Sequence, residues 1–265
     1  MISEKQFVTV NGVQIYCEFI NKHLVDKGLP LLIFLHEGLG SIRQWKNFPD
    51  MLASRLNMPV LLFDRQGYGL SDKRDRPFDS GFLHDEALLK LPELLDALSL
   101  SAHPTILIGH SDGATIALMH AAVSTGEILG IVSEAAHVMV EEITTQGILG
   151  VCDEYKKGKT KELLWRYHGD KTDELVEGWT TNWLSTENRQ WNIDEFLPRI
   201  TCPVLIIQGT NDHFGTFAQV AVIRDSIKGT ASVLYLDNCG HIPHLQAPDT
   251  ITGAITDFIN HITNK

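Results

Sequence analysis

Residues 104–114 read PTILIGHSDGA, and this stretch decides the fold. A short apolar run leads into a Gly-x-Ser-x-Gly turn, where Gly109 and Gly113 flank Ser111, and a helix-prone apolar segment follows. A serine on so sharp a turn needs small neighbours, because larger side chains would collide with the strand before it or the helix after it. The stretch predicts a buried strand, a strained turn that exposes the Ser111 hydroxyl, and a helix whose N-terminus favours negative charge.

The pattern alone also fits a strand that merely ends at Gly109 and a helix capped by Ser111. The rest of the chain decides between these two interpretations. Alternating apolar and polar residues on either side of Asn11-Gly12 predict an opening β-hairpin. Unbroken apolar runs, separated by helix-length segments, predict parallel strands with right-handed crossovers at residues 31–35, 60–63, 128–133, 203–208 and 232–236.

An interruption separates two of these predicted strands. From about residue 141 to residue 191 the apolar runs disappear, and the sequence becomes helical and amphipathic. Four of the chain's five tryptophans lie there: Trp165, Trp179, Trp183 and Trp191. Regular alternation of strands and helices then resumes, so the segment is an insertion between two strands of one sheet.

Length and composition exclude several classes of protein. A chain of 265 residues with 43% hydrophobic residues can bury the core of one α/β domain with an insertion. The net charge of −11 and the scattered Lys and Arg residues argue against a nucleic acid or an anionic membrane as partner. No leader pattern and no apolar run of about 18 residues occurs, so we expect a cytoplasmic protein. Widely spaced cysteines and the lack of a His-Glu-x-x-His motif predict free thiols and neither a metal nor a cofactor.

Two later loops supply what the Ser111 hydroxyl lacks. A hydroxyl is a poor nucleophile at neutral pH, so it needs a base within hydrogen-bond reach and a third group that orients the base. Asp212 follows the strand at residues 203–208, and His241 follows the strand at residues 232–236. The carboxyl ends of parallel strands lie along one edge of a sheet, so the three side chains can converge. The order Ser, Asp, His matches one known arrangement of a catalytic triad.

With these residues in place, the chain resembles the α/β-hydrolase superfamily over essentially its full length. The resemblance rests on the motif GHSDG at 109–113, on Asp212, on Gly240-His241 and on the motif HEGLG at 36–40. It implies an eight-stranded, mostly parallel sheet flanked by helices, with a helical cap inserted after the sixth strand. Residues 1–137 and 193–265 would form the core, and residues 138–192 the cap.

The resemblance also implies an oxyanion hole built from backbone N–H groups. The residue after the nucleophile, here Asp112, supplies one donor. The loop at residues 36–40 supplies the other, which is Gly38 or, if the loop is shifted by one residue, Leu39. Glu37 departs from the commoner His-Gly-Gly pattern, so the choice between Gly38 and Leu39 stays open.

The residues predict acyl transfer through a covalent intermediate. His241 would remove the Ser111 proton, and Asp212 would orient the imidazole. The N–H groups of the oxyanion hole would stabilise the negative charge that develops on the substrate. A tryptophan-rich cap favours a roomy apolar cover and hence a bulky ester or lactone. We expect substrate contacts from six side chains: Glu37, Leu39, Met139, Trp165, Trp179 and Trp183.

The same motifs resemble a bacterial subgroup that includes serine-dependent macrolide esterases, which implies hydrolytic opening of a macrolide antibiotic lactone. Three alternatives stay open: a carbon–carbon bond hydrolase of ring-fission products, a cofactor-free perhydrolase or haloperoxidase, and a non-catalytic binding protein. The first commonly carries Asn and Met around the serine, where this chain has His110 and Asp112. An aspartate nucleophile would stand at the position of Ser111 rather than at Asp112. His244, three residues after His241, is the competing candidate for the base.

Overall fold

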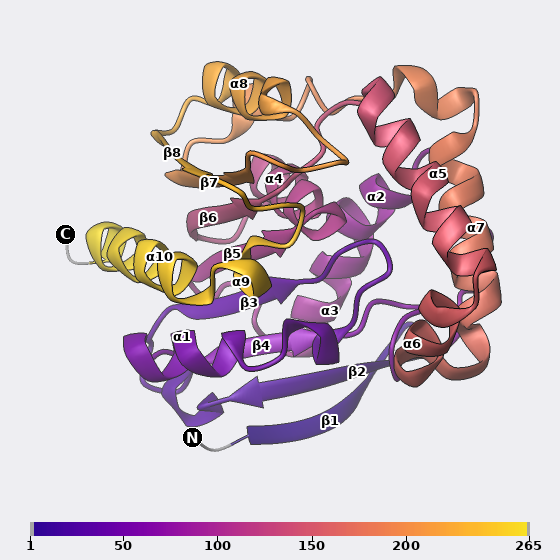
Figure 1. Ribbon diagram of the computed structural model, residues 1–265. Helices are drawn as coiled ribbons and strands as arrows, with labels where there is room; N and C mark the ends of the chain where they lie inside the picture. Colours follow the sequence, from indigo (N-terminus) through magenta and orange to yellow (C-terminus); the bar gives the residue numbers. More distant parts are fainter. Residues whose placement is uncertain (1–2, 264–265) are drawn as a thin grey trace.

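The computed structural model describes residues 3–263 and places the central strand of the sequence motif in an eight-stranded sheet (Figure 1). In spatial order the strands are β1 (Ser3–Val10), β2 (Val13–Ile20), β4 (Val60–Phe63), β3 (Leu31–Leu35), β5 (Thr105–His110), β6 (Ile128–Glu134), β7 (Val204–Gly209) and β8 (Ala231–Leu236). β2 pairs antiparallel with both β1 and β4, and all other pairs are parallel. The predicted α/β-hydrolase fold is therefore confirmed.

Local sequence explains how the sheet begins. Asn11 and Gly12 both adopt positive φ values, 50° and 85°, which a tight hairpin turn between β1 and β2 requires. Further along the chain, every residue of β5 is buried between β3 and β6. Both faces of this central strand are covered, which is why it reads as a continuous apolar run.

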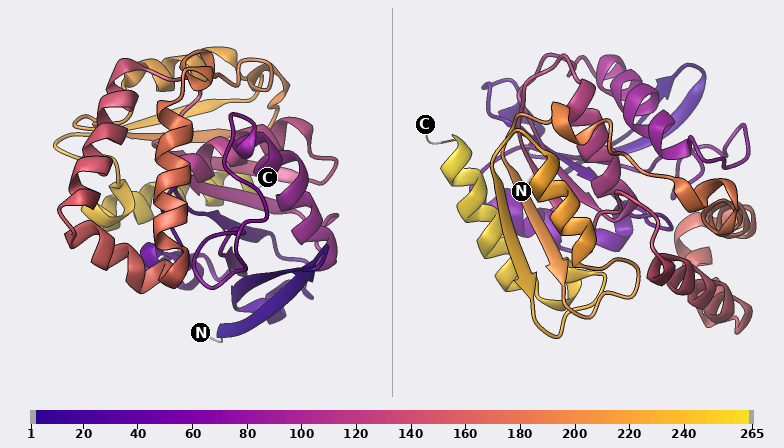
Figure 2. Two further views of the ribbon diagram at one scale, coloured as in Figure 1. Left: turned by 90° about the vertical axis from the view of Figure 1, so that its right-hand side faces the viewer. Right: turned by 90° about the horizontal axis from the view of Figure 1, so that it is seen from above.

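Helices cover both faces of the sheet (Figures 1 and 2). Alternate residues of β3 enter separate hydrophobic cores: Leu32 and Phe34 face one, and Leu31, Ile33 and Leu35 face the other. The first core is closed by α1 (Phe48–Leu56) and α10 (Pro248–Thr263), with the short α9 (Pro243–Gln246) before α10. The second is closed by α2 (Phe82–Asp85), α3 (Leu91–Ala97), α4 (Asp112–Val123) and α8 (Phe217–Ser226). A π-helical turn at Glu86–Lys90 joins α2 to α3.

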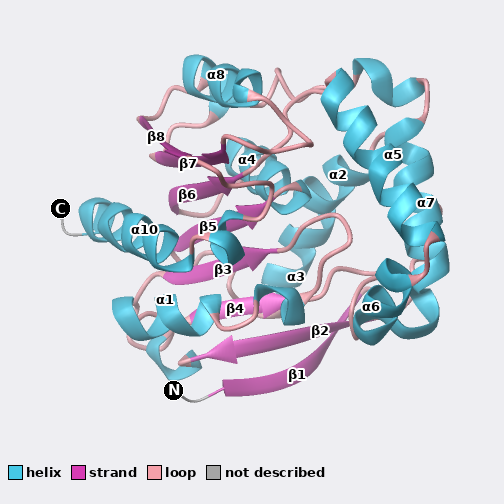
Figure 3. Cartoon of the chain, viewed as in Figure 1, coloured by secondary structure: helices cyan, strands magenta, loops and turns pink. Residues whose placement is uncertain are grey.

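Three further helices lie between β6 and β7 in the sequence and stand beyond the carboxyl ends of the parallel strands (Figures 1 and 3). They are α5 (Glu142–Lys156), α6 (Lys159–His168) and α7 (Thr172–Leu184), and we call them the cap. Met139 and Asn192 form an isolated antiparallel bridge, so the chain leaves the core and returns to it at neighbouring points.

Buried polar contacts fasten the cap to the core. The Lys171 ammonium donates hydrogen bonds to the carbonyl oxygens of Tyr68 and Gly69, at 3.2 and 2.8 Å. The His168 ring accepts a hydrogen bond from the Gly69 N–H through Nδ1 and therefore donates from Nε2 to the Leu39 carbonyl, at 3.0 Å each. His168 ends α6, and Lys171 lies in the 3₁₀ turn between α6 and α7. Both are buried, so these contacts hold the loop after β4 and the loop after β3 under the cap.

Two other predictions can be compared with the structure. All four cysteines are free, as the sequence predicts. No helix within residues 3–263 is long and apolar enough to span a membrane. The cytoplasmic location stays a prediction.

Candidate active site

Ser111 stands at the turn between β5 and α4, with φ 53° and ψ −121°. Such a positive φ is strained for a residue with a side chain, and the surrounding packing maintains it. A Cβ atom on Gly109 would collide with the backbone of Gly113, and a Cβ atom on Gly113 would collide with the Leu35 carbonyl. The Ser111 N–H donates to the Glu134 carbonyl at 2.9 Å, which ties the turn to β6. Both glycines are therefore required where the strand meets the helix.

The structure brings Ser111, His241 and Asp212 together. Ser111 Oγ lies 2.9 Å from His241 Nε2, and His241 Nδ1 lies 2.8 Å from Asp212 Oδ2. Because the Asp212 carboxylate can only accept a hydrogen bond, the proton of the neutral His241 ring lies on Nδ1, and Nε2 can accept the hydroxyl proton of Ser111. Asp212 is held in turn by the Phe214 N–H and the Gln208 amide, each at 2.8 Å. This geometry lets the serine act as a nucleophile with an adjacent base.

Charge at Asp212 suits its place behind the imidazole. Burial by itself raises the pKa of Asp212, but the hydrogen bond and charge of His241 and the Phe214 N–H lower it to about 2. The group is thus ionised at neutral pH and can stabilise a positively charged imidazole.

His244 does not reach the serine. It is the second residue of α9, and its ring Nδ1 lies 3.0 Å from the buried Glu134 carboxylate. The Glu134 carboxylate also accepts the His244 N–H at 2.6 Å. This pair anchors α9 to the end of β6, which leaves His241 as the base in contact with Ser111.

A second pair, of buried His110 and half-buried Glu37, links three loops of the site. The His110 ring lies 3.5 Å from the Glu37 carboxylate through Nδ1 and 2.7 Å from the His241 carbonyl through Nε2. Burial lowers the pKa of His110, but contact with Glu37 and the charge of Glu134 raise it to about 9. Burial raises the pKa of Glu37, and contact with His110 lowers it to about 2. His110 therefore carries a positive charge that holds the loops of Glu37 and His241 against the turn.

Gly38 and Asp112, the predicted oxyanion donors, lie beside Ser111. The N–H groups of Gly38 and Asp112 make no hydrogen bond to any residue within 3–263, and both residues line the cavity beside Ser111. The Trp179 indole packs on Gly38 so closely that a Cβ atom there would collide with it. Its Nε1–H donates to Asp112 Oδ2 at 2.9 Å. The indole thus contacts both Gly38 and the Asp112 side chain and forms part of the cavity wall beside Ser111.

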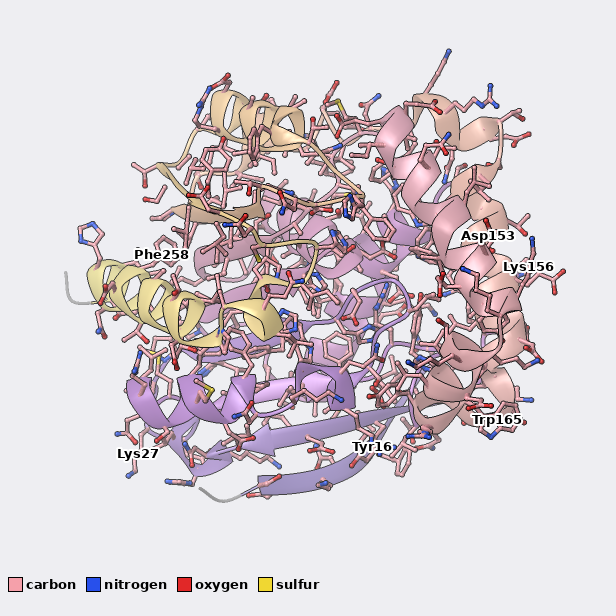
Figure 4. All side chains as sticks on the ribbon, in the orientation of Figure 1. Tyr16, Lys27, Asp153, Lys156, Trp165 and Phe258 are labelled. Carbon is pink, nitrogen blue, oxygen red and sulfur yellow. The ribbon has the colours of Figure 1, made fainter. Side chains whose placement is uncertain are left out.

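The cavity next to Ser111 has a volume of about 170 Å³. Four of the six predicted contact residues line it: Glu37, Leu39, Trp179 and Trp183. Trp165 does not line this cavity: it is 50% exposed on α6 at the outer side of the cap (Figure 4). Met139 pairs with Asn192 where the cap joins the core and does not line this cavity either, so contact of Trp165 and Met139 with substrate stays a prediction.

Several lining residues escaped the sequence analysis. Thr144, Ile148 and Val151 face the cavity from α5, and their spacing of four and three residues is that of one helix face. His137 and Phe214 flank the His241 ring, with centroid separations of 5.7 and 4.5 Å. The helical spacing was visible in the sequence, whereas no local signal marks the two residues beside His241.

No group of three or more His, Cys, Asp or Glu side chains within residues 3–263 is arranged to hold a metal ion. At the carboxyl ends of the parallel strands, a hydroxyl, an imidazole and a carboxylate are hydrogen-bonded in series, which is the arrangement of a catalytic triad. The protein-family model described as "Alpha/beta hydrolase family" matches residues 32–254, and the chain belongs to this family.

Relatives with described activities are also hydrolases. Serine hydrolase BPHL of Mus musculus is 28% identical over 261 residues, which cover 95% of this chain and 85% of that protein. A 2-hydroxy-6-oxo-6-(2'-aminophenyl)hexa-2,4-dienoic acid hydrolase of Metapseudomonas resinovorans is 19% identical over 97% of this chain and 91% of its own length. The crystal structure of an enol-lactonase from Burkholderia xenovorans LB400 superposes with a TM-score of 0.73 at 19% identity, covering 96% of this chain and all of that one. The last comparison shows a shared fold.

Proposed function

We propose that the protein is a serine hydrolase that cleaves compact carboxylic esters or lactones through an acyl-enzyme. The observation that carries this proposal is the continuous hydrogen-bonded arrangement of Ser111, His241 and Asp212, with contacts of 2.9 and 2.8 Å. His241 removes the hydroxyl proton as Ser111 attacks the carbonyl carbon, and it then protonates the departing alcohol. Water, activated by the same imidazole, releases the acid. The N–H groups of Gly38 and Asp112 stabilise the oxyanion in both steps.

The size of the cavity supports a compact substrate. Its volume of about 170 Å³ lies below the range of about 300–1,000 Å³ typical of sites for drug-sized ligands. An apolar cavity of about 150 Å³ holds benzene, so an acyl group of roughly that size fits here. Hydrolysis of a macrolide lactone, which the sequence motifs imply, needs far more room and gains no support from this cavity.

Charge in the cavity supports a neutral or cationic substrate. Two carboxylates, of Glu37 and Asp112, line it, whereas no Lys or Arg within residues 3–263 does. His110 balances the charge of Glu37. Burial raises the pKa of Asp112 above its usual value, whereas the charge of the buried Arg65 and the hydrogen bond from the Trp179 indole act in the opposite direction. A substrate ammonium group near the carbonyl would lower this pKa and pair with the ionised Asp112 carboxylate, whereas a substrate carboxylate would raise the pKa further and find no ion pair with Asp112.

The carboxyl groups in the cavity also make carbon–carbon bond hydrolysis of a ring-fission product less favourable. The Metapseudomonas relative acts on a dienoic acid, as its name states. A dienoate would bring an anion into a cavity lined by carboxylates. We therefore rank ester hydrolysis above carbon–carbon bond cleavage for this chain.

One panel of substrates tests the proposal. Wild-type protein and Ser111→Ala are incubated with p-nitrophenyl acetate, butyrate and benzoate, a macrolide and a ring-fission dienoate, and products are read by absorbance and mass spectrometry. We expect turnover of the three esters by the wild type, none by Ser111→Ala, and an unchanged macrolide. Cleavage of the dienoate in preference to every ester, or ester turnover that survives in Ser111→Ala, would overturn the proposal. Circular dichroism of Ser111→Ala controls for folding.

A further inference from the structure

Arg65 is a buried cation directly behind the active site. It follows β4, is 2% exposed, and stacks over the Tyr68 ring with 4.5 Å between its guanidinium carbon and the ring centroid. Its Nη2 donates to the carbonyl oxygens of Glu37 and His36, at 2.8 and 3.3 Å. Its Nε and Nη1 are buried and find no hydrogen-bond partner within residues 3–263. Burying a guanidinium with so few hydrogen-bond partners costs desolvation free energy, which points to a role for Arg65 at this position.

The Glu37 carbonyl that Arg65 contacts also accepts a hydrogen bond from His36. The backbone N–H of Arg65 donates to His36 Nε2 at 3.2 Å, so the proton of the neutral His36 ring lies on Nδ1. His36 Nδ1 lies 2.9 Å from the Glu37 carbonyl oxygen and therefore donates to it. Burial and the Arg65 charge hold the pKa of His36 well below its usual value, which keeps the ring neutral. Two side-chain donors thus converge on one peptide oxygen, which also accepts the Gly40 backbone N–H at 3.1 Å.

That peptide carries the candidate oxyanion donor. The Glu37 carbonyl and the Gly38 N–H belong to the same planar trans peptide, in which the two groups point in opposite directions. Because the carbonyl is fixed toward buried Arg65, the N–H of Gly38 is directed away from it, to the side of the cavity that Gly38 lines. Donors on a peptide carbonyl also polarise the peptide and strengthen its N–H as a donor. The same geometry favours Gly38 over Leu39 as the first oxyanion donor.

We propose that Arg65 is a positioning residue for the oxyanion hole: with His36 it fixes and polarises the Glu37–Gly38 peptide, so that the Gly38 N–H binds the oxyanion more strongly than the ground-state carbonyl. This inference rests on the proposed function, because an ester hydrolase forms the oxyanion twice in each turnover. Arg65 acts through the peptide and touches no substrate. It is a charge-assisted donor, and such bonds are about twice as strong as neutral ones.

The test compares transition-state binding with ground-state binding. Arg65→Met keeps much of the side-chain length without charge or donors, and Arg65→Lys keeps the charge with different geometry. For each variant we would measure kcat and KM on p-nitrophenyl butyrate and the inhibition constants of a trifluoromethyl ketone and its methyl ketone counterpart. The trifluoromethyl ketone forms a hemiketal oxyanion on Ser111, whereas the methyl ketone binds mainly as the free carbonyl. Melting temperatures establish that the variants are folded at the assay temperature.

In Arg65→Met we expect kcat to fall by about 10- to 100-fold, below the loss of about 10² to 10³ for removal of a whole oxyanion donor. KM should stay within about threefold, and trifluoromethyl ketone affinity should fall by the same factor as kcat/KM while methyl ketone affinity changes little. Arg65→Lys should show a smaller loss with the same selectivity. Equal weakening of both ketones would mean that Arg65 only supports the loop, and an unchanged kcat would mean that it is not needed; either result overturns the inference.

Two controls keep the result interpretable. If Arg65→Met does not fold, the ratio of the two ketone affinities in Arg65→Lys and wild type carries the test, and an unchanged ratio rejects the inference. Labelling of wild-type Ser111 by a fluorophosphonate reports on the proposed function separately. A labelled, ester-cleaving wild type with a normal Arg65→Met variant contradicts only the role of Arg65. A wild type that neither reacts with the label nor cleaves esters contradicts the proposed function itself.

Discussion

Replacing Asp212 by asparagine tests how the site is held together, because the substitution alters charge and hydrogen-bond direction with little change in size. The Asp212 carboxylate accepts from the Phe214 N–H, the Gln208 amide and His241 Nδ1. An asparagine side chain has one oxygen and one NH₂ group, so at least one of these donors then faces another donor. The arrangement also favours the His241 tautomer with Nε2 protonated, which cannot accept the Ser111 proton.

The magnitude of the effect has a kinetic part and a stability part. In a catalytic triad of known mechanism, the equivalent substitution lowers kcat by about 10⁴, or about 5 kcal/mol of barrier. The pKa of Asp212 falls from its usual value of 3.8 to about 2 on folding, which corresponds to about 2 kcal/mol. Because the folded-state pKa is depressed, this stability is present above about pH 4 and is lost as the pH falls toward 2.

Stopped-flow hydrolysis of p-nitrophenyl butyrate and urea unfolding between pH 7 and pH 3 measure the two parts. Asp212→Asn should be less stable than wild type by about 2 kcal/mol at pH 7, and the difference should begin to close below about pH 4. A loss of kcat smaller than tenfold would refute the argued role of Asp212 in orienting His241. A stability difference that is unchanged down to pH 3 would refute the electrostatic part.

Three further predictions concern the cap and the cavity. Trp165→Ala should leave kcat/KM within about twofold in steady-state assays, because this side chain is half exposed. In the same assays Trp179→Phe should raise KM up to about tenfold, because it loses the hydrogen bond to Asp112. Lys171→Met should lower the free energy of unfolding in urea by about 1–3 kcal/mol, since it leaves buried carbonyls without a donor; an unchanged midpoint would argue against the cap contact. An ester of an amino acid should have a higher kcat/KM than the matched ester with a carboxylate, and Asp112→Asn should reduce that preference; equal values in the wild type would contradict the charge argument.

Local signals in the sequence were sufficient for most of the fold. The Asn11-Gly12 turn and the Gly109-x-Ser111-x-Gly113 turn both depend on backbone conformations that few residues adopt, so their residue types reveal the geometry. Fully buried strands such as β3 and β5 read as apolar runs for a similarly direct reason. The parallel sheet then brings the ends of distant strands together, and the placement of Ser111, Asp212 and His241 follows from topology.

The lining of the cavity could not be predicted as well. Trp165 and Trp179 are the same residue type on neighbouring cap helices, but one faces solvent and the other covers Gly38. Which face of a cap helix points inward depends on how the helices pack together, which no local pattern records. For a similar reason Arg65 looks like an ordinary loop charge in the sequence, because its burial is a property of the folded core.

Covalent trapping of the acyl group tests directly whether Ser111 is the nucleophile. The wild type is mixed with p-nitrophenyl trimethylacetate, whose hindered acyl group slows the second step, then quenched in acid within the first turnover, digested and analysed by tandem mass spectrometry. We expect a burst of p-nitrophenol and one trimethylacetyl group on the peptide at Ser111, with neither in Ser111→Ala. Turnover without acyl at Ser111, or acyl on a different residue, would contradict it.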